Sequence, residues 1–255
     1  MTEIWATNMR VVRTDAWRMW HTPGVWVGAA GIMLAMLIAM GSGLWVDLPK
    51  GVEPGYHVTL LLTGLDSELL VACVPICATL AYGTAFVEEL DSGYVRFSLS
   101  RCSSAAYAHA KALVPMLGGA ASLALGVCGT WAALALIYGP FESAGETGVG
   151  YPLGTLLSRL LLLALNGGLW SGVGTLFADL TRSKYTAYAA PFIFYYVLVM
   201  LQERYVTDWI WLSPRAWVAP QPGCPGGMWG TVAFLVLIGV ATYLINRTVI
   251  EERLQ

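Results

Sequence analysis

Charged residues are scarce in this sequence. They make up 12% of its 255 residues, whereas a soluble domain carries about a quarter. Hydrophobic residues make up 57%, and the mean hydropathy is +0.63. A soluble globular domain is therefore excluded. The net charge of −2 and the lack of a basic cluster also argue against nucleic-acid binding.

Groups that carry out chemistry are scarce as well. The three histidines, His21, His57 and His109, fall near the ends of apolar segments, and no H-E-x-x-H motif is present. The apolar segments hold essentially no carboxylate, which a proton- or sodium-coupled carrier places near the membrane midplane. Ser171 has no histidine at its depth to activate it. These absences disfavour a membrane enzyme and an ion-driven transporter.

Two further absences concern phosphate binding and disulfides. No G-x-x-x-x-G-K-[ST] loop occurs, so the chain itself is not expected to bind ATP through such a loop. The five cysteines form no disulfide framework. Cys73 and Cys77 lie one helical turn apart, but without a histidine or carboxylate at their depth we expect them to pack between helices.

Long apolar runs without charge are what the sequence does contain. A membrane helix needs about 20 apolar residues to cross about 30 Å of hydrocarbon. The runs are continuous rather than alternating, and lipid satisfies no backbone group, so they predict helices. We expect an all-α polytopic membrane protein with one transmembrane domain, 1–255. Six charge-free runs carry this prediction: Gly24–Val46, Leu69–Val87, Ala112–Phe141, Leu160–Ala178, Tyr185–Leu201 and Ala216–Ile245.

The expected organisation follows from these runs. Apolar and basic residues recur at helical spacing in residues 1–22, which indicates an amphipathic helix in the inner membrane interface. Small residues every four positions, at Gly118, Ser122, Gly126 and Thr130 and again at Gly168 and Gly172, predict close helix packing. The predicted spans lie near 24–46, 67–88, 110–139, 157–178, 185–202 and 227–246.

Basic residues predict the orientation, because lysine and arginine in short loops stay in the cytoplasm. With the N-terminus inside, 10 of the 14 fall on the cytoplasmic side and 4 on the outer side, so both termini are expected in the cytoplasm. The outer four are Lys50, Arg159, Arg204 and Arg215. The inner ten are Arg10, Arg13, Arg18, Arg96, Arg101, Lys111, Arg182, Lys184, Arg247 and Arg253.

One charged segment interrupts the apolar runs. It reads FVEELDSGYVRFSLSRCSSAAYAHAK, over residues 86–111, and falls between the second and third predicted spans. The segment resembles the first cytoplasmic loop of ABC-2-type transporter permeases, the membrane subunits of bacterial ABC exporters. The residues that match are Glu89, Gly93, Tyr94, Arg96, Tyr107 and Lys111. The family's Ser-Arg pair would fall on Ser103-Ser104, and Arg101 is the candidate replacement for its arginine.

The resemblance extends to the architecture and implies a function. It implies the six-helix ABC-2 (type V exporter-like) fold, with 89–109 as a coupling loop that contacts a separate ATPase. Arg182 and Lys184 lie in a second cytoplasmic turn. ATP and Mg would be bound by two copies of that ATPase, and the permease would pair with itself or a related permease among the membrane lipids. No cofactor is expected in this chain.

The function implied by the resemblance is export across the bacterial plasma membrane. The substrate would be a peptide, an antibiotic or another hydrophobic compound, with a role in antibiotic resistance or immunity. The alternative that the sequence leaves open is a stand-alone membrane protein, either a polytopic scaffold or an enzyme acting on lipid.

Overall fold

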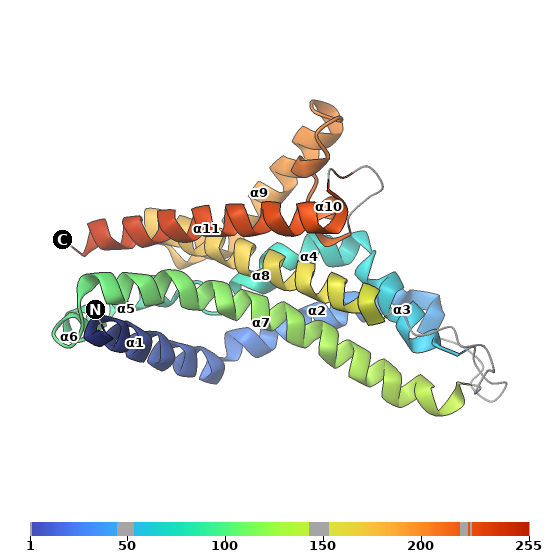
Figure 1. Cartoon of the computed structure of the whole chain (residues 1–255), viewed down its shortest axis with the longest axis horizontal. Helices are drawn as coiled ribbons and strands as arrows, with labels where there is room; N and C mark the ends of the chain where they lie inside the picture. The colour runs from blue at the N-terminus through green and yellow to red at the C-terminus, as the bar shows by residue number, and fades with distance from the viewer. Residues whose placement is uncertain (1, 45–53, 143–152, 220–223, 225, 255) are drawn as a thin grey trace.

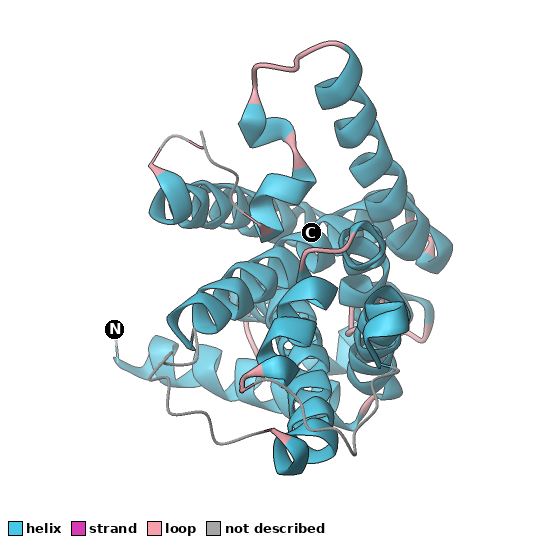
Figure 2. Cartoon of the chain, turned by 90° about the vertical axis from the view of Figure 1, so that its right-hand side faces the viewer, coloured by secondary structure: helices cyan, strands magenta, loops and turns pink. Residues whose placement is uncertain are grey.

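The chain is helical throughout the part that the structure describes. The computed structural model describes residues 2–44, 54–142, 153–219, 224 and 226–254, and no β-strand is assigned within them (Figures 1 and 2). Five helices are long and apolar enough to cross a membrane, or up to six if a bent helix pair counts as one span. The chain is therefore a multi-pass, all-α membrane protein.

The helices follow one another with short connections, and both described termini lie at the same end of the molecule (Figure 1). In chain order they are α1 Thr2–His21, α2 Pro23–Met40, α3 Tyr56–Leu65, α4 Glu68–Thr79, α5 Ala85–Asp91, α6 Tyr94–Leu99, α7 Ser104–Tyr138, α8 Leu153–Thr181, α9 Lys184–Arg204, α10 Pro214–Val218 and α11 Gly227–Arg253. Short 3₁₀ turns follow α2 (Gly41–Leu44), α7 (Gly139–Phe141) and α9 (Ile210–Leu212).

The second predicted span differs from the sequence prediction. Within 67–88 the structure has α4 and the separate short helix α5, with turns between them where Tyr82 has a φ of 72°. α3 lies before the predicted span and meets α4 at a 69° bend. Ser67 stabilises this bend, because its hydroxyl donates to Gly64 O at 2.7 Å and also accepts from Leu70 N at 3.2 Å. One side chain thus satisfies backbone groups of both helices at the bend.

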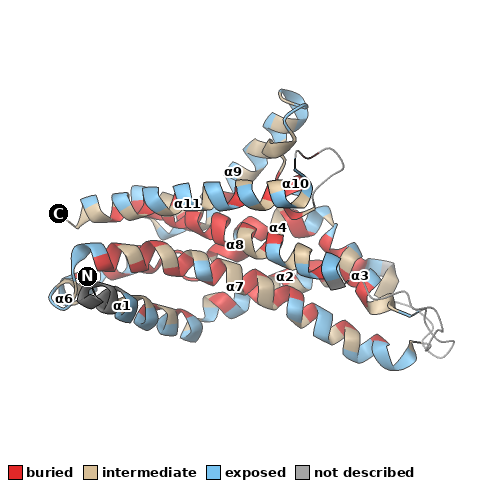
Figure 3. Ribbon diagram, in the orientation of Figure 1, coloured by how far each residue is buried: buried red, intermediate tan, exposed pale blue. Residues whose placement is uncertain are grey.

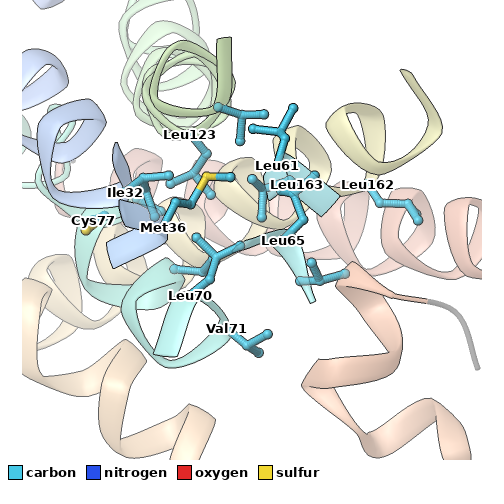
Figure 4. Close-up of a cluster of buried hydrophobic side chains, with 14 of the residues drawn as sticks. Ile32, Met36, Leu61, Leu65, Leu70, Val71, Cys77, Leu123, Leu162 and Leu163 are labelled. Atoms are coloured by element: carbon cyan, nitrogen blue, oxygen red, sulfur yellow. The ribbon is translucent and has the colours of Figure 1, made fainter. Parts of the chain in front are cut away.

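The hydrophobic core lies where α2, α3, α4, α7 and α8 meet. Figure 4 shows side chains from these helices converging, among them Met36, Leu65, Leu70, Leu123 and Leu162. Burial is highest along α3, α4, α7 and α8, whereas α9 and the outer face of α11 are largely exposed (Figure 3). The most apolar 18-residue stretch of α8 is 61% buried, whereas that of α9 is only 11% buried. Figures 1 and 2 show α9 leaving the bundle.

The small residues of α7 pack on two different helices. The predicted face turns toward α2: Ser122 Oγ donates to Val25 O at 3.0 Å, and a Cβ added to Gly126 would lie 2.8 Å from Ala29 O. The closest contact between α7 and α8 lies at Gly119, which follows Gly118 of that face. There Gly119 and Gly167 approach so closely that a Cβ on either would overlap the other's carbonyl oxygen.

The Gly119–Gly167 contact generates a stability prediction. Gly119→Val would force apart the backbones of α7 and α8, because the new side chain would overlap Gly167 O and Ser171 Cβ. Overpacking of this kind costs about 1–3 kcal/mol. We expect less protein in the membrane and a lower unfolding temperature in detergent. Gly129→Val is the matched control on the same helix, since its nearest neighbour is Met33 Sδ at 3.9 Å. Equal behaviour of the two variants would contradict the packing.

Candidate functional site

The charged segment 86–111 forms short helices rather than an open loop. α5 ends at Asp91, and Gly93 then takes a left-handed conformation, with φ of 72°, before α6 begins. The Ser103 hydroxyl accepts from Ala106 N at 3.3 Å and so caps the start of α7. Serine is a favoured residue at this capping position. Tyr107 and Lys111 therefore lie on α7 itself.

Glu89, near the end of α5, is the centre of an ionic network. Its Oε1 accepts from Lys111 Nζ at 2.9 Å and from Arg18 Nη1, and its Oε2 accepts from the Tyr107 hydroxyl. Lys111 and Tyr107 come from α7, and Arg18 comes from α1. One carboxylate thus joins three helices whose sequence positions are far apart.

Asp15 on α1 completes the network. Its carboxylate lies 2.9 Å from Lys111 Nζ and 3.5 Å from Arg18 Nη1. Lys111 also lies over the rings of Tyr82 and Tyr107, 5.4 Å from each centroid. Two cations therefore face two carboxylates. We call Asp15, Arg18, Glu89, Tyr107 and Lys111 the ionic network.

The burial of this network was not predicted from the sequence, which placed Glu89 at the start of a coupling loop over 89–109. Glu89 is 4% exposed, Asp15 5% and Lys111 1%, while the Arg18 side chain is 42% exposed. Burial by itself raises the pKa of Glu89. The charge of Lys111 and the hydrogen bonds from Lys111, Tyr107 and Arg18 outweigh it and hold that pKa below its usual value. Glu89 is therefore held as a carboxylate.

Three predicted site residues remain exposed. Tyr94, 47% exposed, opens α6 and lies under the Arg18 guanidinium, 5.2 Å from its ring centroid. Arg96 and Arg101 are exposed, and neither has an ion pair among the described residues. Phe97, which sequence analysis did not single out, is 70% exposed on α6. Tyr94, Arg96 and Phe97 form the outer surface of α6, and Arg101 lies just after it.

The second predicted turn, between α8 and α9, lies beside this region. Arg182 adopts a left-handed conformation with φ of 53°, and Lys184 Nζ lies 3.9 Å from the Asp91 carboxylate at the end of α5. Arg253 of α11 donates to Leu180 O at 2.9 Å. The turn is therefore tied to α5 on one side and to α11 on the other.

Two features of this end of the molecule were not predicted from the sequence. Asp15 and Arg18 look like polar positions of an amphipathic helix, because Lys111 and Glu89, which they contact, are more than 70 residues away. The second feature is Asp179, which lies in the last turns of α8. This residue is 1% exposed, and neither carboxylate oxygen has a hydrogen-bond partner in the described part of the chain. The local signal was a carboxylate ending an apolar run, which resembles an exposed helix end.

A second polar contact lies at the opposite end of the bundle. Glu142, from the predicted outer loop, accepts from Gly55 N at 3.1 Å, from His57 N at 3.0 Å and from the His57 ring. It therefore caps the start of α3 with a negative charge. Burial raises the pKa of Glu142, but the hydrogen bonds from His57 and Gly55 outweigh it and the pKa is lowered. The rest of that loop, 143–152, lies outside the described residues.

The described side chains do not form a nucleophile with its base. Ser171 Oγ donates to Pro115 O at 2.7 Å, inside the α7–α8 contact, so the hydroxyl is used in packing. Cys73 and Cys77 lie in or against the hydrophobic core. Within the described residues, no group of three histidine, cysteine, aspartate or glutamate side chains is arranged to hold a metal ion. What the ionic network can do is link the movements of α1, α5 and α7.

Comparisons with known proteins identify no relative. No protein-family model matches the chain, and neither the curated proteins nor the solved structures give a match.

The ionic network predicts which charge removals damage the fold. Lys111→Met would leave the buried carboxylates of Asp15 and Glu89 with only Arg18. Removing one partner of a buried ion pair costs about 3–5 kcal/mol. The double variant Lys111→Met/Glu89→Gln removes one charge of each sign and should regain part of the loss. Thermal unfolding in detergent and membrane abundance measure both effects.

Arg96→Ala is the matched control for these variants, because it also removes a cation but from an exposed position. We expect it to change stability by less than about 1 kcal/mol. The network would be refuted if Lys111→Met were as stable as Arg96→Ala. It would also be refuted if the stability losses of Lys111→Met and of Glu89→Gln, each measured alone, simply added in the double variant.

Proposed function

We propose that this chain is the transmembrane permease subunit of an ATP-driven ABC exporter in the bacterial plasma membrane. A separate soluble ATPase, in two copies, binds ATP and Mg and supplies the energy. The observation that supports this proposal best is the position of Glu89. It lies four residues before Gly93 and α6, in the segment that resembles a coupling loop, and its carboxylate is bonded to α1 and α7.

The network offers a route for mechanical coupling. When an ATPase moves α6, the short connection through Gly93 passes the displacement to α5 and to Glu89. Glu89 and its partners move together, because separating a buried carboxylate from its cations costs several kcal/mol. The displacement then reaches α7, a continuous helix of 35 residues, and α1 at the membrane interface. A rigid charged contact is thus the first element of the coupling pathway.

The docking surface is the exposed side of α6. Phe97 supplies an apolar contact and Arg96 an unpaired cation, a combination that suits a groove on a soluble protein. Glu89 belongs to the coupling machinery behind this surface, because it is buried. Glu89, Tyr107 and Lys111 therefore transmit motion, while Tyr94, Arg96 and Arg101 lie on the contact side.

The exposure of α9 supports a second permease, either another copy or a related chain. Only Ala187 and Pro191 are classed as buried along its 21 residues, while Phe192, Phe194 and Tyr196 are each more than 40% exposed. A neighbouring permease would cover this aromatic surface. The two subunits would then enclose the substrate pathway between them.

A cavity beside α9 supports a hydrophobic or peptide substrate. It has a volume of about 630 Å³ and lies between α4, α9 and α10. Aromatic side chains, including Tyr195 and Tyr196, line one wall, and Glu68 and Glu203 lie at the rim. Aromatic walls accept apolar and cationic groups. This is the chemistry expected for peptides and many antibiotics, so a resistance or immunity role fits.

The distribution of cations supports cytoplasmic termini. Nine of the ten predicted inner cations lie in α1, in or just after α6, at the α8–α9 turn, and in α11. The tenth, Lys111, lies two turns into α7. Arg159 and Arg215 bind Asp66 and Glu68 at the α3–α4 bend, away from that end. Both described termini lie at one end (Figure 1), which supports an even number of crossings, with α3 and α4 together as the sixth.

The orientation is tested by cysteine labelling in a cysteine-free background. Glu252→Cys, on the exposed end of α11, should react only when the reagent reaches the cytoplasm. Asp208→Cys, in the exposed connection after α9, should react from outside. The native Cys224 is a poor probe because it is only 9% exposed. The reverse labelling pattern would invert the topology and place α6 outside the cell.

Variants of α6 test the proposed function. Phe97→Ala and Arg96→Ala should each weaken ATPase binding about fivefold, because each removes an exposed contact group, while leaving the fold intact. Gly93→Val should be worse, because a φ of 72° is strained for a β-branched residue. An added Cβ meets no atom within 4 Å, so the effect would come from backbone strain and not from a clash. Binding is measured by co-purification with the partner ATPase, sought first among adjacent genes, and by substrate-dependent ATP hydrolysis.

Trp229→Ala is the control for the α6 variants, because this side chain is 73% exposed at the start of α11, far along the chain from α6. If the α6 variants bind the ATPase, hydrolyse ATP and confer resistance as well as this control, the coupling proposal fails. If no ATPase co-purifies with the wild-type chain at all, the stand-alone scaffold or lipid-acting enzyme becomes the better explanation.

A further inference from the structure

A cavity of about 470 Å³ lies between α1, α6 and the start of α7, on the open side of the ionic network. Its walls include Arg10 and Arg18 from α1, Tyr94 and Phe97 from α6, and Arg101 just before α7. Asp15 and Glu89 are the acids in its lining. The cavity is therefore built by the interfacial helix and the proposed coupling helix together.

The charges of this cavity do not balance. Asp15 and Glu89 are neutralised by Lys111 and Arg18 within the ionic network. Arg10 and Arg101 then remain, and neither makes an ion pair or a side-chain hydrogen bond within the described part of the chain. Two unpaired guanidinium groups thus share one cavity, and this arrangement favours an anion with several acceptor oxygens.

The apolar neighbours indicate where such an anion comes from. Phe97, 70% exposed, lines the same cavity as the two arginines. On α1, Trp17 is 67% exposed and Trp20 40%, and tryptophan is the residue that anchors helices at the level of lipid headgroups. An anion held here would have an apolar surface beside it, which suits a lipid better than a free inorganic ion.

We propose that this cavity binds the phosphate headgroup of an anionic membrane lipid, with Arg10 and Arg101 as the donors and Phe97 beside the apolar part of the lipid. The bound headgroup would connect α1 to the segment after α6 and leave the exposed side of Arg96 free. The proposal does not depend on the exporter function, because it concerns the chain alone in its membrane.

The test measures lipid retention by the purified full-length chain. Phosphatidylglycerol is the probe, and phosphatidylcholine, whose zwitterionic headgroup carries a phosphate but no net charge, is the comparison. Native mass spectrometry and lipid-dependent thermal stabilisation report binding. We expect phosphatidylglycerol to be preferred, and Arg10→Ala and Arg101→Ala each to weaken its binding about tenfold, since each removes a charge-assisted hydrogen bond to the phosphate.

Two matched controls separate a site from general surface charge. Arg13→Ala removes an exposed arginine from the same helix as Arg10, and Arg96→Ala removes one from α6. Neither residue lines the cavity. Both controls should stay within about twofold of the wild type, because a charge outside the site contributes only a screened, long-range attraction. All four side chains are exposed, and unchanged unfolding temperatures without added lipid confirm that the fold is intact.

Three outcomes would overturn the proposal. Equal losses in the Arg10 and Arg13 variants would mean general attraction of basic residues to the membrane. Equal stabilisation by glycerol phosphate or inorganic phosphate would mean a free phosphate site without a lipid. Equal retention of the two lipids would mean that no anion is selected. ATPase binding is measured separately, so a failed exporter proposal leaves this result unaffected.

Discussion

The neutralisation of buried charge governs one whole end of this molecule. Lys111 lies seven residues into α7, about 10 Å along the helix axis, where an unpaired ammonium would be strongly unfavourable. Glu89 and Asp15 provide the opposing charges, and each comes from a different helix. α1 and α5 must therefore dock against α7 for the charges to be satisfied. Arg18 reaches in from the half-exposed rim and balances the second carboxylate.

The bundle depends on a different physical principle away from this end. Hydrophobic side chains gain little from leaving lipid, so the helices are held by close packing. Gly119 and Gly167 bring α7 and α8 into backbone contact, and Ser122 bonds directly to a carbonyl of α2. Polar contacts are thus kept to the two ends and to a few helix crossings. The charged network and the apolar bundle meet on α7, which takes part in both.

The sequence predicted the membrane-spanning class because long charge-free runs have few alternative structures. It did not predict that the second span is broken at 80–84, since that stretch is apolar and carries no charge, or that a further apolar helix, α3, precedes it at a bend held by Ser67. The small-residue pattern identified the face of α7 that meets α2 but not the glycine pair that meets α8. Glycine spacing indicates that helices approach closely without indicating which helices do so.

The site residues show the same limit. The resemblance to the permease loop singled out Glu89, Gly93, Tyr107 and Lys111, and the structure gives Gly93 a left-handed conformation. Their burial was not predictable, because it depends on α1, whose Arg18 is 71 positions from Glu89. A charge near the end of an apolar run looks exposed until its distant partner is known. Whether those residues couple to an ATPase stays a prediction.

The sparse packing of α9 has a consequence for the rest of the chain. Its first half is held by Ala187 and Pro191, while its second half has few buried side chains. The free energy that fixes its direction is therefore small compared with that of α7 and α8. It begins at the turn where Arg182 has a left-handed backbone and Lys184 faces Asp91. α9 is thus held less firmly than the rest of the bundle, and the turn where it begins lies beside α5, one of the helices that carry the ionic network.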